Sequence, residues 1–165
     1  MAPVTRIAVQ RVADLLTTGN ALGQQISNLA AANGSEIPTI SSDQVIVSSA
    51  PVAMGDLNAQ FTYPRVCLYA SAVKNQQIEK FRSLSGTISV VGEVWASANL
   101  LQDADEWIHF YVEAFTIILR QNIGDWGQGM FFSGMYDVQF QPPKAGGLGY
   151  IESAKVTSDV NISLN

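Results

Sequence analysis

The spacing of apolar positions predicts two amino-terminal helices followed by a short strand. Between positions 4 and 16, apolar residues recur at steps of three and four, and this stripe stops near Gly19 and Asn20. A second short helix is expected from position 22 onward and should end at Gly34. Within residues 41–50, valines alternate with polar neighbours, as they do in a short strand.

Alternation with a period of two predicts four longer strands in the rest of the chain. The first two, at positions 63–71 and 87–96, should form a β-hairpin. The last two, at positions 132–140 and 150–163, should pair antiparallel. The hairpin has a long, polar and exposed tip, which contains Lys74, Asn75, Gln76 and Gln77.

One long helix separates the two pairs of strands, and it carries more apolar surface than one sheet can cover. Asp103 and Glu106 are spaced as in a capping box, and the helix should run to about Gln121. A helix that lies on one sheet needs a single apolar stripe of about 100°. We expect this helix to be covered on its second flank as well, either by the amino-terminal helix or by a neighbouring subunit. The two stripes are Trp107, Tyr111, Ala114 and Ile118, and Ile108, Val112, Phe115 and Leu119.

This order of elements predicts an α+β fold in a single domain over residues 1–165. A single antiparallel or mixed β-sheet with a long β-hairpin should be packed by one long central helix and an amino-terminal helix. Residues 1–34 form the helical segment, and residues 41–165 form the sheet and the central helix. Loops are expected at residues 51–62 and 141–149, where proline and glycine are frequent.

Composition limits the classes of function. The 165 residues are 47% hydrophobic and only 14% charged, with a formal net charge of −5. The nine basic residues are scattered singly, so the chain has no stripe that could follow nucleic-acid phosphates. The first residues lack the pattern of a secretion signal and no apolar run is long enough to span a bilayer, so we expect a protein made in the cytosol without membrane contact.

Each candidate chemical centre has a simpler structural interpretation. The acids Asp103, Asp105 and Glu106 suit the positive end of a helix. Cys67 and His109 would need a third group to orient them for nucleophilic catalysis, and the sequence shows none. The glycines after position 145 lead into a strand rather than a helix, so they do not build a phosphate-binding turn. We therefore expect no enzyme, no cofactor and no metal.

A set of short motifs resembles the tail terminator, or tail completion, proteins of long-tailed bacteriophages. The motifs are Tyr63-Pro64-Arg65-Val66, then Phe81-Arg82-Ser83-Leu84-Ser85-Gly86 leading into an alternating strand, then the long helix, then Trp126 and Gly134-Met135-Tyr136 before two last strands. The likeness covers roughly residues 60–163, and the amino-terminal helix is compatible with it.

The resemblance implies a structural virion protein of the tail and neck. Such a protein forms a ring of six copies on the finished tail tube, stops tube polymerisation and offers a surface to the head–tail connector. Its partners would be copies of itself, the tail tube protein and the connector, and DNA would pass through the lumen without sequence-specific binding. The virion would be assembled in the host cytoplasm.

Three segments are candidates for contact with a neighbouring subunit or the tube. Projecting loops often carry contacts because a rigid scaffold positions them. The candidates are Lys74, Asn75, Gln76 and Gln77 at the hairpin tip, Val112, Phe115 and Leu119 on the second flank of the long helix, and Pro142, Pro143 and Lys144 in the late loop.

Two alternatives remain at this point. The chain could be another neck component, such as a head-completion or tail-to-head joining protein, or a tube subunit, because one fold serves several roles. A remote alternative is a small-molecule binding module with a pocket between helix and sheet. Against the latter, no convergent polar groups mark such a pocket in the sequence.

Overall fold

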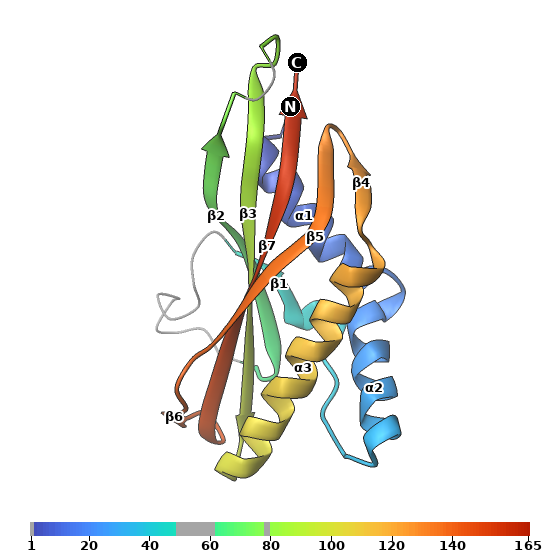
Figure 1. Cartoon of the computed structure of the whole chain (residues 1–165). Coiled ribbons are helices and arrows are strands. Elements are labelled where there is room, and N and C mark those ends of the chain that lie inside the picture. The colour runs from blue at the N-terminus through green and yellow to red at the C-terminus, as the bar shows by residue number, and fades with distance from the viewer. Residues whose placement is uncertain (1, 49–61, 78–79) are drawn as a thin grey trace.

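The computed structural model describes residues 2–48, 62–77 and 80–165, and these residues form the α+β fold that the sequence predicts (Figure 1). One mixed, curled sheet is covered on one face by all three α-helices. Both termini lie at the same end of the molecule. The predicted loop at residues 51–62 falls almost entirely outside the described residues.

Two helices and a short 3-10 turn make up the amino-terminal segment, as predicted. The chain leaves the first helix through Gly19 and Asn20, which both have left-handed backbone conformations. The second helix ends at Gly34, whose N–H donates to the carbonyl oxygens of Ala30 and Ala31. The elements are α1 (Val4–Thr17), η1 (Thr18–Asn20) and α2 (Ala21–Asn33).

The sheet is built around two very long neighbouring strands, β3 and β7. Its strand order is β1-β2-β3-β7-β5-β4, with β6 paired to β7 beside the end of β5. All strand pairs are antiparallel except β1 with β2. The bounds are β1 (Val45–Val47, after η2 at Ser42–Gln44), β2 (Arg65–Asn75), β3 (Leu84–Ala98), β4 (Gly124–Gly127), β5 (Met130–Phe140), β6 (Lys144–Gly146) and β7 (Gly149–Leu164).

The long helix α3 (Leu101–Gln121) crosses the sheet face formed by β3 and β7. It begins two residues earlier than predicted, and the expected capping box is absent. Glu106 instead accepts a hydrogen bond from Ser35 Oγ at 2.9 Å, because α2 and the segment after it run alongside this end of α3. The tight contact between α3 and β3 depends on Gly92. A Cβ there would lie 2.5 Å from the Phe115 ring.

The predicted loop at residues 141–149 is partly a further β-hairpin, formed by β6 and β7, so this expectation is wrong for its second half. Lys144 pairs with Ile151 and Gly146 with Gly149, leaving Gly147 and Leu148 as a two-residue turn. Gly147 has φ +56°, and a Cβ there would lie 2.4 Å from Ser97 Oγ. Several glycines in succession therefore build a tight turn here rather than an irregular loop.

Candidate functional site

The three predicted contact segments lie in three different places. The hairpin tip is at one end of the molecule, which we call the arm end, where it lies beside the end of β7 (Figure 1). Pro142, Pro143 and Lys144 are exposed at the opposite end, beside the first turn of α3, and we call this the base end. The helix residues lie between the two ends, in the core.

The prediction that the second flank of α3 reaches a neighbouring subunit is wrong. Val112, Phe115 and Leu119 are only 6%, 1% and 0% exposed within the single chain. The sheet and the amino-terminal helices cover both apolar stripes. This confirms the first of the two alternatives from the sequence, in which the amino-terminal helix covers the second flank. These three residues hold the fold together and offer no surface for assembly.

The arm end carries apolar side chains that the rest of the chain leaves uncovered. Phe81 is 95% exposed and Val73 is 46% exposed. Where β2 ends, the amides of Gln76 and Gln77 both donate to the Ser85 carbonyl at 2.8 and 3.0 Å, which joins the two sides of the hairpin.

The arm end is also basic. Among its described residues Lys74, Lys80 and Arg82 are exposed, and Glu79 lies outside the described part of the chain. Arg82 Nη1 donates to Asn165 Oδ1 at the carboxyl terminus, which ties the arm to the end of β7. Lys80 makes no ion pair with a described residue, and its side chain is exposed.

The base end has an open pocket of about 590 Å³ beside the start of α3. Its lining combines apolar and acidic side chains: Leu101, Gln102, Asp105, Pro143 and Glu152. The β6–β7 turn braces this end, because the Leu148 amide donates to Ser97 Oγ at 2.9 Å. Leu148 itself is 64% exposed.

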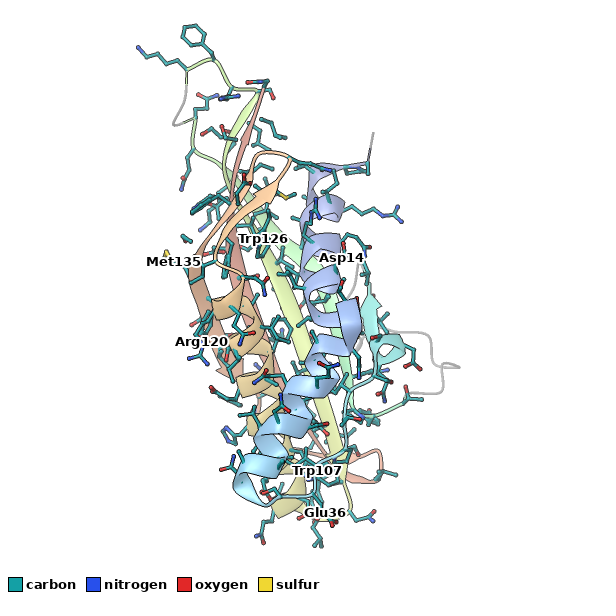
Figure 2. All side chains as sticks on the ribbon, turned by 90° about the vertical axis from the view of Figure 1, so that its right-hand side faces the viewer. Asp14, Glu36, Trp107, Arg120, Trp126 and Met135 are labelled. Carbon is teal, nitrogen blue, oxygen red and sulfur yellow. The ribbon has the colours of Figure 1, made fainter. Side chains whose placement is uncertain are left out.

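Negative charge is concentrated around this pocket. Burial raises the pKa of Glu152 above its ordinary value, the nearby Asp105 raises it further, and His109 opposes both. Glu152 is only 7% exposed. Asp105 lies 3.8 Å from His109 Nε2, and Figure 2 shows a further acid, Glu36, at the same end of the molecule with Trp107.

The structure keeps Cys67 and His109 apart. Cys67 is buried on the sheet face that points away from the helices, whereas His109 is an exposed residue of α3 that lies against the Phe140 ring at 4.6 Å. Burial raises the pKa of the Cys67 thiol, which disfavours the reactive thiolate. Among the described residues, no group of three or more His, Cys, Asp or Glu side chains is arranged to hold a metal ion.

The face of the sheet away from the helices holds a buried polar group that the sequence did not reveal. Arg65 and Glu93 are both buried there, and Tyr69 Oη donates to Glu93 Oε2 at 3.3 Å. Burial, together with the adjacent Glu93, raises the pKa of Tyr69 to about 12. One feature of the sequence could have indicated that this face is buried. Val91 and Trp95 are apolar residues on this face of β3, and apolar residues on both faces of a strand indicate that both faces are covered.

No protein-family model matches the chain, and no curated protein matches its sequence. No helix among the described residues is both long enough and apolar enough to cross a bilayer.

Proposed function

We propose that the chain is a structural subunit that assembles with copies of itself into a ring and caps a phage tail tube. In this role it ends tube polymerisation and provides the surface to which the head–tail connector binds. The observation that carries the proposal is the arm: a hydrogen-bonded hairpin that holds Phe81 95% exposed beyond the folded core. Full burial of such a side chain is worth roughly 1.5–3 kcal/mol, and aromatic side chains often anchor the contacts between proteins.

The order of elements supports the tail terminator role within the class of assembly proteins. The resemblance rests on a hairpin that begins at residues 63–66, a long helix and two last strands, and these elements occur in that order as β2, β3, α3, β5 and β7. The chain itself covers the flank of α3, so this flank does not take part in the proposed assembly. The proposed contacts are made by surfaces at the two ends of the molecule.

Native mass spectrometry of the purified chain tests the assembly step. We expect closed oligomers of one size, because a head-to-tail contact closes into a ring when the rotation at each step allows it. Filaments of unlimited length would indicate a tube subunit. A monomer at every concentration up to about 100 μM, far above the dissociation constants of stable interfaces, would contradict self-assembly.

Removal of the protein during infection tests the role in the tail. A terminator should leave tails of uncontrolled length. Tails of normal length that stay unattached to heads would instead identify a joining protein. Tails and heads that assemble normally would contradict the whole proposal.

A further inference from the structure

We infer that the arm of one copy inserts Phe81 and Lys80 into the base-end pocket of a second copy. This inference rests on the proposed self-assembly and names the contact that produces it. The two surfaces lie at opposite ends of the same chain, and each presents what the other lacks. The arm offers an exposed ring next to an exposed lysine, and the pocket offers apolar side chains next to two carboxylates.

The contact has to form between two molecules. The long strand β3 has 15 residues and connects the arm end to the base end. At about 3.3 Å per residue it spans roughly 50 Å, so no bending of the hairpin brings Phe81 to the pocket of its own chain. Because the two surfaces are different, the contact is head-to-tail and can extend to many copies.

The apolar part of the match concerns Phe81 and the rim of the pocket. Leu101 and Pro143 line the open pocket, whose volume of about 590 Å³ leaves room for one aromatic ring. Leu100 and Leu148 are exposed at the same end. An aromatic anchor surrounded by such side chains excludes water from its centre, which is the usual arrangement at the strongest point of an interface.

The charged part of the match gives the contact its direction. Asp105 and Glu152 line the pocket, and Asp103 and Glu106 lie on adjacent turns of α3. His109 and Lys144 are the basic groups near them among the described residues, and neither lies in the lining of the pocket. A second copy would bring Lys80 next to these carboxylates, of which Glu152 is only 7% exposed.

The main test compares two exposed phenylalanines. Phe81→Ser removes the anchor, whereas Phe131→Ser changes a phenylalanine that is 49% exposed on β5 and outside this contact. In sedimentation velocity across a concentration series, Phe81→Ser should raise the concentration of half-assembly by about thirtyfold or more, and Phe131→Ser should leave it within about threefold. Assembly of Phe81→Ser at the same concentration as the unmodified chain would overturn the inference.

A charge exchange tests the pairing of the two ends. Lys80→Glu and Asp105→Lys should each weaken assembly by about fivefold, and the double variant should recover most of the loss, because the pair is restored with its signs reversed. Both positions are exposed, and circular dichroism of each variant verifies that it is folded. A double variant that assembles more weakly than both single variants would overturn the inference.

These outcomes separate the contact from the function. Closed rings that form despite Phe81→Ser would remove the inferred contact and leave the proposed ring in place. A chain that stays monomeric at every concentration would contradict both.

Discussion

Two phenylalanines illustrate how differently the same side chain is used in this molecule. Phe115 lies on α3 and is 1% exposed, while Phe81 lies on the arm and is 95% exposed. From the sequence, the helix was the stronger candidate for contact with a second copy, because it is rich in apolar residues whereas the arm is mostly polar. The comparison shows that an excess of apolar surface on one element predicts that something covers it, but the cover can be the chain itself. An isolated apolar residue at the tip of a projecting hairpin has no such cover within reach.

The largest expected effect is the loss of Phe115. Phe115→Ala removes a ring that packs against Gly92 in the core, and it should lower the free energy of unfolding by about 3–5 kcal/mol. Chemical denaturation of the monomeric protein, or of dilute samples, measures this change. The exposed Glu113→Ala is the matched control on the same helix; it loses only a 2.8 Å surface ion pair with Arg120 and should cost about 0.5 kcal/mol or less. A cost below about 1 kcal/mol for Phe115→Ala would mean that this flank is not in the core.

A methyl group added opposite the same ring should have the next largest effect. Gly92→Ala places a Cβ 2.5 Å from Phe115 and 3.2 Å from Leu68, so either the ring or the strand has to move. Overpacking of this kind typically costs about 1–3 kcal/mol. The measurement is again the unfolding free energy. In the double variant with Phe115→Ala, the methyl group enters the vacated space and the added cost should largely vanish.

The long helix, the β2–β3 hairpin and the packing of helices on a sheet could be predicted from sequence because they follow from local periodicity. The sequence did not show which element packs against each apolar stripe of the helix. Whether α2 or a second copy covers α3 depends on the chain direction after Gly19 and Asn20, where two left-handed residues turn the chain. The close approach at Gly92 was likewise hidden, because a glycine within a strand indicates a near neighbour without identifying it.

The site was less predictable than the fold for a related reason. The arm and the late loop were correctly expected to be exposed, but their separation to opposite ends appears only once the strand register is known. Asp105 and Glu152 are 47 positions apart in sequence and meet because β7 passes beneath the first turns of α3. No spacing rule connects two such positions.

The pH dependence of stability tests the environment of Glu152 in the base-end pocket. Because the pKa of Glu152 is raised in the fold, its ionised form destabilises the folded state at pH values above that raised pKa. The penalty fades as pH falls through the raised pKa towards the ordinary value of 4.5. Glu152→Gln should therefore be more stable than the unmodified chain at pH 7–8 and equal to it near pH 4 in thermal unfolding curves. An equal difference at both pH values would show that packing, rather than charge, is responsible.

The smallest expected effect on stability is that of Phe81→Ala, and it distinguishes Phe81 from Phe115 most directly. Phe81→Ala should change the free energy of unfolding of the monomer by no more than about 0.5 kcal/mol, because the ring makes almost no contact within its own chain. Measured below the assembly concentration, the unfolding curve of this variant should overlay that of the unmodified chain, in contrast to Phe115→Ala. If Phe81→Ala lost about 1 kcal/mol or more in the monomer, the arm would fold back on its own molecule. The exposed ring would then be part of the core, as Phe115 is, and the distinction between the two phenylalanines would disappear together with the reason to assign the arm to a neighbouring copy.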